Sequence, residues 1–270
     1  MYPSFKVMMD LASHGPDTYV GAGPHYPWHG LYGGQIVAQA LRAAELTVKP
    51  SYLPHSLHAY FIRMGDPDEP VRFEVERLRD GRSFVARQVV ARQSTGAILN
   101  MSASFQVESA PTMDVQLAER PQVAGPEEGK ELSWSGLFEI RSVEGSYQDL
   151  AEGRPAACSW FRVLEALDDR PATHAAALAY ASDSGPGWLV SSLHEAKCAP
   201  GPAWRPVSLD HALWFHRPFR ADDWLLFQAS ASSLYNSRGL CRGRMFAQDG
   251  ALVASVAQEV LLRRPHRPDA

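Results

Sequence analysis

Two stretches of this sequence have the spacing of helices and almost no polar face. In residues 33–48 (GGQIVAQALRAAELTV) the polar side chains fall on one narrow stripe, and residues 172–181 (ATHAAALAYA) have hardly any stripe. A helix that is apolar around most of its circumference has to be enclosed by other elements. Whatever this chain folds into must therefore wrap two separate helices.

Each of these helices is followed by four stretches with the composition of β-strands, and alternation is clearest in VRFEVER. Residues typical of tight turns separate several of them, for example Asp80-Gly81, Ser94-Thr95-Gly96 and Asp249-Gly250. The pattern predicts a buried helix followed by an antiparallel meander, and predicts it twice. The expected strands are 56–63, 71–78, 83–92 and 98–107 in the first half, and 210–216, 225–232, 239–247 and 252–262 in the second.

The two halves are also weakly similar in sequence. His58-Ala59 matches His211-Ala212 at an offset of 153, and GAIL from Gly96 matches GALV from Gly250 at an offset of 154. Such matches indicate an internal duplication. Residues 108–131 are rich in Pro, Glu and Gly without sustained periodicity, which predicts a linker. We therefore expect an N-terminal domain over 1–107 and a C-terminal domain over 132–270.

Composition narrows the class of protein. Of 270 residues 45% are hydrophobic, and 26 basic against 30 acidic residues give a net charge of −4. That balance supplies no basic surface for a phosphate backbone, so nucleic-acid binding is not expected. No uncharged apolar stretch approaches the roughly 18 residues of a membrane span, and no leader pattern is visible, so we expect a soluble, cytoplasmic protein. The cysteines, Cys158, Cys198 and Cys241, are odd in number and far apart, which favours reduced thiols.

The motifs of several common hydrolases are missing. The sequence has no G-x-S-x-G elbow, no H-E-x-x-H and no Cys/His cluster with ligand spacing. His55 and His58 are close in sequence, but on a strand they would point to opposite faces of the sheet. We therefore expect no metal site.

Six strings, taken in order, carry a family resemblance: GGQIVAQAL, HSLHAYFIRMGDP, LRDGRSFVARQV, YASD, LDHALWFHRPF and VASVAQE. Together they resemble the acyl-CoA thioesterase II family of bacteria and peroxisomes, over about 30–106 and 160–263. The resemblance implies an α+β double hotdog fold, in which two antiparallel sheets are each wrapped around a central helix. It also implies hydrolysis of acyl-CoA thioesters, with CoA as part of the substrate and no separate cofactor.

Asp183 ends the second helical stretch at YASD. It can be a solvated residue of a helix–loop junction, or a carboxylate whose pKa is raised by burial and by the helix dipole, as a general base requires. The resemblance favours the second reading, because Asp183 matches the family's catalytic acid. Ser208 matches the hydroxyl residue of the same network and Gln258 its amide, although alternation does not decide whether Gln258 or Glu259 faces inward.

Substrate-binding candidates come from the first half. Gly33-Gly34-Gln35 opens the first helix, where glycines allow close packing and free N–H groups can bind an oxyanion. Arg82 and Ser83 follow Asp80-Gly81, where arginines can serve a plain hairpin turn or bind CoA phosphates. His58, in the second matched string, is the remaining candidate.

The sequence therefore predicts that Asp183, Ser208 and Gln258 hold and deprotonate a water that attacks the thioester carbonyl directly. The alternative is a non-catalytic acyl-CoA binding or scaffold protein, because the Gly- and Pro-rich loop SGPGW follows Asp183 and could displace it. A hotdog hydratase is disfavoured, since its helical Asp and His motif is missing. Paired hotdogs often associate further, so we expect a homo-oligomer.

Overall fold

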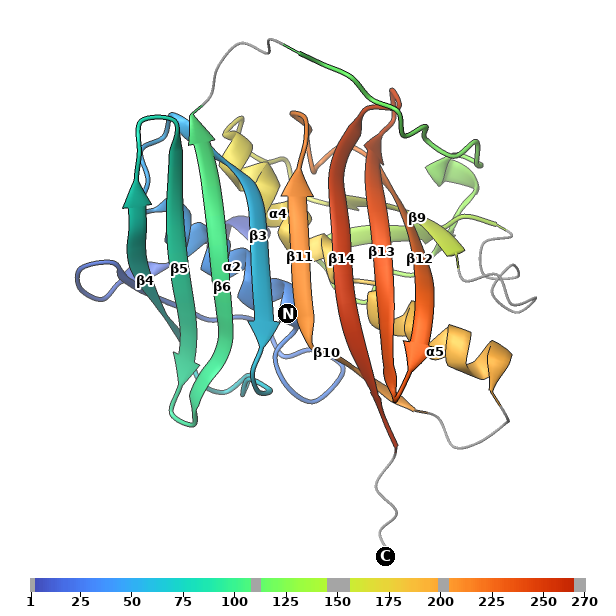
Figure 1. Cartoon of the computed structure of the whole chain (residues 1–270), viewed down its shortest axis with the longest axis horizontal. Coiled ribbons are helices and arrows are strands. Elements are labelled where there is room, and N and C mark those ends of the chain that lie inside the picture. The colour runs from blue at the N-terminus through green and yellow to red at the C-terminus, as the bar shows by residue number, and fades with distance from the viewer. Residues whose placement is uncertain (1–2, 108–112, 145–155, 199–203, 265–270) are drawn as a thin grey trace, which may run out of the picture.

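The computed structural model describes residues 3–107, 113–144, 156–198 and 204–264. It contains one long antiparallel sheet with the helices gathered on one face (Figure 1). The first half comprises α1 (Phe5–Met8), β1 (Ala12–Ser13), β2 (Thr18–Gly21), α2 (Gly33–Glu45), β3 (Tyr52–Phe61), β4 (Val71–Asp80), β5 (Phe84–Gln93) and β6 (Gly96–Val107).

The second half repeats that order with additions. It comprises the 3₁₀ turn η1 (Pro126–Glu128), β7 (Lys130–Glu131), β8 (Phe138–Ser142), β9 (Ala156–Val163), α4 (Pro171–Ser182), α5 (Pro186–Lys197), β10 (Arg205–Ser208), β11 (Asp210–Phe215), β12 (Leu225–Tyr235), β13 (Arg238–Ala247) and β14 (Leu252–Arg263). All eight predicted strands and both predicted helices are present, with ends displaced by a few residues.

The two halves share one sheet. Strands β3 and β11 pair antiparallel, with His211 opposite Ala59, and this pairing joins the two meanders into a sheet whose described residues form 14 strands. The fold is a double hotdog, as predicted. The larger of two apolar clusters extends through both halves, and a small second one gathers around Trp160 and Trp224 in the second half.

The helices α2 and α4 pack against each other behind the sheet, near the junction of the two halves (Figure 1). A Cβ on Gly34 would lie only 2.3 Å from the carbonyl oxygen of Tyr180, so the backbones approach more closely than a side chain allows. The bond between Gly34 and Asp183 brings the first turn of α2 to the C-cap of α4. The two helices therefore run antiparallel, and the start of α2 meets the end of α4.

Helix α5 was not predicted. It begins inside SGPGW, with Gly185 at φ 122° as its N-cap and Pro186 at its first position. Its buried Val190 packs over Gly239 on the inner face of β13. The segment after Asp183 is thus the start of a helix that covers the second half of the sheet, and the prediction of a loop there is wrong.

The structure corrects one of the two repeat matches. His58 is exposed on the outer face of β3, whereas His211 is completely buried on the inner face of β11, so the two histidines are not equivalent. At an offset of 154, Arg63 and Arg217 correspond, and each donates to a backbone carbonyl at the start of its own β6 or β14. Gly96 and Gly250, at φ 109° and 96°, keep the 154 offset at equivalent turns.

The segment between the halves runs along the second half wherever it is described. Its first residues, 108–112, lie outside the described part of the chain. Three contacts hold the part that is described against the second half. Asp114 forms an ion pair with Arg217, and the side chain of Gln116 accepts from the backbone N–H of Leu252. The carbonyl of Ala124 accepts from the indole of Trp160. Among the described residues, no helix has the length and apolar character that crossing a membrane demands.

Candidate active site

The three predicted catalytic residues lie within hydrogen-bonding distance of one another. The Gln258 Nε2 donates to Asp183 Oδ1 at 2.9 Å and to Ser208 Oγ at 2.7 Å. The Ser208 hydroxyl lies 3.5 Å from Asp183 Oδ1. We call these three residues the carboxylate–amide cluster.

Each member of the carboxylate–amide cluster is placed by the local fold. Asp183 is the C-cap of α4, and Ser208 ends β10, which pairs with β14 opposite Val260. Along β14 the buried positions alternate through Val256, Gln258 and Val260, so the amide faces the core and its neighbour Glu259 does not. The burial pattern of β14 therefore shows that Gln258, and not Glu259, faces inward, which the sequence alone did not decide.

The first half completes this site. The backbone N–H of Gly34 donates to Asp183 Oδ2 at 2.9 Å. A Cβ on Gly33 would lie 2.7 Å from the same oxygen, so a larger residue there would press on the carboxylate. The Gly34 amide is thus already bonded to Asp183, which differs from the predicted role as an oxyanion donor.

Burial and hydrogen bonds act on Asp183 in opposite directions. Desolvation raises its pKa above the ordinary value of 3.8, while His211 and the hydrogen bonds from Gln258, Gly34 and Ser208 lower it, and the rise prevails. A carboxylate with a raised pKa accepts a proton from water more readily than a solvated one. The environment of Asp183 therefore suits a general base.

His211 is a member of this site that the sequence reasoning missed. Its ring lies 2.7 Å from Gln258 Oε1 through Nδ1 and 2.8 Å from Ser182 Oγ through Nε2. The signal was present in LDHAL, where His211 and the buried Leu213 alternate toward the core. His211 was used in the sequence analysis only as the partner of His58 in the internal repeat.

Gln35 is placed away from the carboxylate–amide cluster. Its side chain is completely buried, accepts from the Tyr26 hydroxyl at 2.7 Å and donates to Gln39 at 3.2 Å. Gln39 in turn donates to the carbonyls of Met8 and Ala22. The polar stripe of α2 thus binds the N-terminal segment to the helix, and Gln35 is not brought to the site as a substrate ligand.

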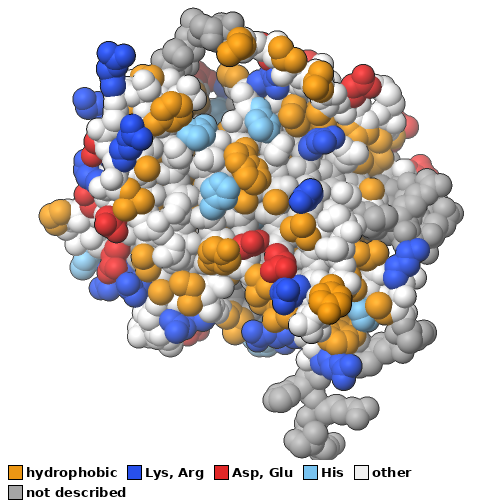
Figure 2. All heavy atoms as spheres, viewed as in Figure 1, with side chains coloured by type: hydrophobic (Ala, Val, Ile, Leu, Met, Phe, Trp, Pro, Cys, Tyr) orange, Lys and Arg blue, Asp and Glu red, His pale blue; other side chains and the backbone are white. Residues whose placement is uncertain are grey.

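His58 lies on the opposite face of the sheet from the carboxylate–amide cluster. Its ring packs edge-on against Trp214, with ring centroids 5.1 Å apart. Figure 2, which views this outer face, shows histidine and hydrophobic side chains scattered among basic ones. The structure does not support contact between His58 and a substrate held at Asp183, because the sheet separates them.

Arg82 and Ser83 are exposed in the turn between β4 and β5. The Tyr52 hydroxyl, at the start of β3, donates to the carbonyls of Gly81 and Arg82. The turn lies near the end of α2 that is remote from Gly34, because Arg87 bonds both to Thr47, just after α2, and to Asp80. A helix of 13 residues spans roughly 20 Å, so this turn lies far from Asp183. The structure does not bring Arg82 and Ser83 into the site.

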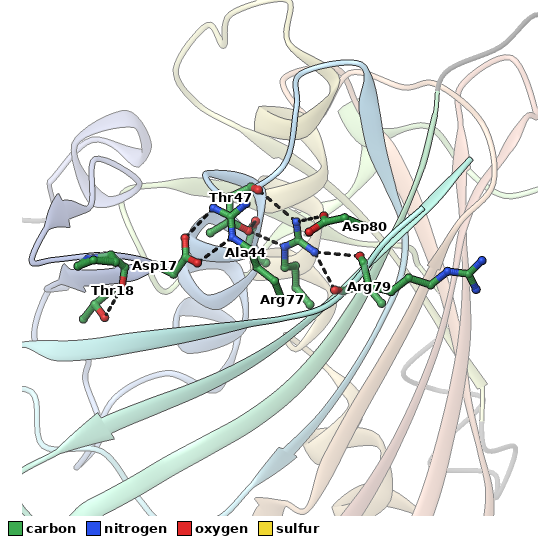
Figure 3. Close-up of polar contacts among 10 residues, drawn as sticks. Asp17, Thr18, Ala44, Thr47, Arg77, Arg79 and Asp80 are labelled. Atoms are coloured by element: carbon green, nitrogen blue, oxygen red, sulfur yellow. Dashed lines mark hydrogen bonds and ion pairs between the residues drawn. The ribbon is translucent and has the colours of Figure 1, made fainter. Parts of the chain in front are cut away.

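Charged side chains, among them Asp17, Arg77 and Asp80, gather between the end of α2 and this hairpin (Figure 3). Arg87 is only 1% exposed and donates to Thr47 Oγ, to the carbonyl of Arg79 and to the carboxylate of Asp80. Thr47 follows α2 and donates to the carbonyl of Ala44. These contacts link the end of α2 to the hairpin, which is a structural role.

A small aromatic cavity of about 10 Å³, room for about one water molecule, lies beside the carboxylate–amide cluster. Ala181 and Ser184, which flank Asp183 closely in sequence, form part of its wall. Burial and the nearby Asp183 carboxylate raise the pKa of Tyr32, whose hydroxyl donates to the carbonyl of Tyr180. The aromatic residues of the wall are Tyr32, Trp134, Phe138, Phe161, Tyr180 and Phe227.

The described residues hold no group of three or more His, Cys, Asp and Glu side chains arranged to bind a metal ion. Burial raises the pKa of Cys158 to about 11 and that of Cys241 to about 12. Both thiols are therefore protonated near neutral pH and are poor nucleophiles.

The fold and the carboxylate–amide cluster define a double hotdog protein with a candidate general base at the junction of its halves. Comparison with known families gives the finer identity: the acyl-CoA thioesterase N-terminal domain matches residues 23–106 and the acyl-CoA thioesterase C-terminal domain matches residues 113–262. The chain belongs to the acyl-CoA thioesterase family.

Individual relatives agree with this family along most of their length. The chain is 35% identical to acyl-coenzyme A thioesterase 8 of Homo sapiens, over 89% of this chain and 83% of the relative. It is 32% identical to acyl-CoA thioesterase 2 of Haemophilus influenzae, over 86% of this chain and 87% of the relative. The crystal structure of acyl-CoA thioesterase II TesB2 from Mycobacterium marinum superposes with a TM-score of 0.82 at 36% identity, covering 97% of this chain and 98% of that one.

Proposed function

We propose that this protein hydrolyses acyl-CoA thioesters to a free carboxylic acid and CoA. The observation that carries the proposal is the carboxylate–amide cluster, because it joins a buried, basic carboxylate to a hydroxyl and an amide in one hydrogen-bonded group. Family membership supports the substrate class, since the relatives are named for acyl-CoA thioesters.

In the proposed reaction, a water molecule is held by Asp183 and Ser208, and Gln258 fixes the positions of both. Asp183 takes a proton from this water as its oxygen attacks the thioester carbonyl. The C–S bond then breaks, the acid leaves, and the proton passes from Asp183 to the CoA thiolate. The reaction draws on no metal or redox group, because a thiolate is already a good leaving group.

We assign the Gly34 amide to Asp183 rather than to the substrate. Its bond to Oδ2 directs Oδ1 toward Ser208 and Gln258, where the proposed water binds. The aromatic cavity beside the site has an apolar wall but a volume of only about 10 Å³, so an acyl group would enter it only if the wall residues moved apart.

The alternative of a non-catalytic acyl-CoA binding protein rested on a displaced Asp183. The segment SGPGW forms the start of α5 instead of an irregular loop, and Asp183 keeps two hydrogen bonds shorter than 3.0 Å. These observations favour turnover over binding alone.

The test is thiol release from a panel of short, medium and long acyl-CoAs, followed by kinetics of Asp183→Asn on the best substrate. Positioned general-base catalysis contributes roughly 10²–10⁴-fold, so kcat should fall by that factor while binding of a non-hydrolysable CoA thioether changes little. Ser208→Thr, which keeps the hydroxyl, is the matched control and should retain activity that Ser208→Ala loses. A parent protein that binds the thioether but releases no thiol would establish the binding alternative.

A further inference from the structure

We propose that His211 is a positioning residue for this site: it fixes the amide of Gln258 so that its nitrogen, and not its oxygen, faces Asp183. The kinetic consequence rests on the proposed function, whereas the orientation itself does not. Nothing in the sequence pattern singled out this role.

His211 closes a ring of hydrogen bonds around the carboxylate–amide cluster. Its Nδ1 bonds to Gln258 Oε1, Gln258 Nε2 bonds to Asp183, and its Nε2 bonds to Ser182, which precedes Asp183 at the end of α4. The imidazole is completely buried, so solvent does not compete for either nitrogen. The ring of bonds therefore ties α4, β11 and β14 together at one point.

The orientation of the amide matters because its two ends have nearly the same shape and opposite polarity. With Nε2 toward the site, Gln258 donates to both Asp183 Oδ1 and Ser208 Oγ. In the flipped orientation, Oε1 would face Asp183 Oδ1, so the bond to Asp183 would be lost and two acceptor oxygens would lie against each other. A hydrogen on His211 Nδ1 is compatible only with Oε1 of Gln258 beside it, and therefore with Nε2 facing Asp183.

Whether His211 Nδ1 carries hydrogen depends on its second neighbour, Ser182. The Ser182 hydroxyl lies 2.8 Å from Nε2 and 3.0 Å from the carbonyl of Ala179. It can donate to an unprotonated Nε2, which leaves the proton of a neutral imidazole on Nδ1. When Ser182 donates to Ala179 instead, it accepts from Nε2–H, and Nδ1 then carries hydrogen only if the imidazole is doubly protonated. The proposal therefore requires an imidazole with hydrogen on Nδ1, because Gln258 Oε1 beside it is an acceptor.

Two variants of similar shape distinguish the hydrogen bond that His211 donates from the space that its ring fills. His211→Asn can place an amide nitrogen where Nδ1 stood, and His211→Leu has the same branching without a donor. We expect His211→Leu to lower kcat by about 10- to 100-fold, in line with the cost of misplacing a catalytic group, with little change in the affinity for a CoA thioether. His211→Asn should recover a large part of this loss.

A double-mutant cycle tests whether His211 acts through Gln258. In a Gln258→Leu background, adding His211→Leu should cause no further loss of kcat, because the amide that it positions is gone. Additive losses, or equal impairment of His211→Asn and His211→Leu, would overturn the proposal. If Gln258→Leu itself turns over like the parent, the catalytic cluster of the proposed function fails instead.

A measurement on the parent protein covers the case in which the variants do not fold. Ring ¹⁵N NMR reports which imidazole nitrogen carries hydrogen. A protonated, hydrogen-bonded Nδ1 of His211 is expected, and a bare Nδ1 contradicts the proposal whether or not the protein releases thiol.

Discussion

Asp183 has an unusual surrounding for a carboxylate at the end of a helix. Desolvation raises its pKa, and the donors Gln258, Gly34 and Ser208 each stabilise its charged form. A carboxylate in bulk water is too weak a base for this task, and one buried without donors would stay protonated near neutral pH. The combination makes Asp183 more basic than an exposed aspartate, while its donors limit the rise in its pKa.

The raised pKa of Asp183 sets the acid limb of activity. A general base must be deprotonated, so kcat/KM should fall as the pH drops toward its pKa, and this fall should begin at a higher pH than an ordinary aspartate gives. The Gln258 bond lowers that pKa, so Gln258→Leu should move the limb to still higher pH. The measurement is kcat/KM against pH for parent and variant.

The control for this prediction is Gln106→Leu, the same change at an exposed position of β6. Its acid limb should coincide with that of the parent. A Gln258→Leu limb that stays in place or moves to lower pH would show that the amide does not act on the pKa of Asp183.

At this scale, the sequence identified single residues better than their partners. Asp183 and Gln258 were predicted because they stand in matched strings, and Ser208 because it directly precedes one. The bond from Gly34 to Asp183, by contrast, joins positions 149 residues apart. His211 was missed because its role depends on the register of β11 against β14 and on the end of α4. No local pattern encodes such contacts.

At the scale of elements, the long strands were predictable because each one alternates and is bounded by turn residues. β9 (AACSWFRV) lacks clear alternation, and α5 was taken for a loop because Gly and Pro open it. Pro is common at the first position of a helix, so Pro186 was a usable signal for the start of α5. The site depends most on the contact between α2 and α4, which neither helix reveals alone.

A Gly34→Ala substitution tests this helix–helix contact. The new Cβ would lie 2.3 Å from the carbonyl oxygen of Tyr180 and 2.5 Å from the ring of Tyr32, so α4 must move away. Overpacking of this kind costs about 1–3 kcal/mol, which outweighs the roughly 1 kcal/mol that alanine gains over glycine in a helix. Urea unfolding should show a lower free energy of unfolding, and kcat should fall because Asp183 moves with α4.

Gly125→Ala is the matched control. A Cβ at Gly125 meets no atom within 4 Å, and its φ is −68°, so alanine fits without strain. Stability and kcat should stay near the parent values. Equal stability of Gly34→Ala and the parent would mean that the two helices do not approach as closely as described.

At the scale of the whole molecule, the duplication has produced one carboxylate–amide cluster from two related halves. Asp183 is the C-cap of α4, whereas the apolar Leu46 is the C-cap of α2. The second residue of α2 is Gly34, whose N–H bonds to Asp183, whereas the second residue of α4 is Ala172 and faces no carboxylate cap on α2. The antiparallel helix pair is therefore equipped for chemistry at one end only, and that end takes residues from both halves.

Because both halves build the sheet and the site, cutting the chain between them should leave an active protein. A specific protease site inserted between Glu119 and Arg120 lies in the described coil before η1, where Glu119 is exposed. After cleavage, the β3–β11 pairing, the α2–α4 contact and the Gly34–Asp183 bond still hold the halves together. We expect two fragments on a denaturing gel, one species in native size-exclusion chromatography, and kcat within about twofold of the uncut insertion variant, since the contacts that position catalytic groups are unchanged.

Unfolding of the cut protein should also become concentration-dependent, because unfolding now releases two chains. Fragments that separate under native conditions would contradict a sheet shared by the two halves.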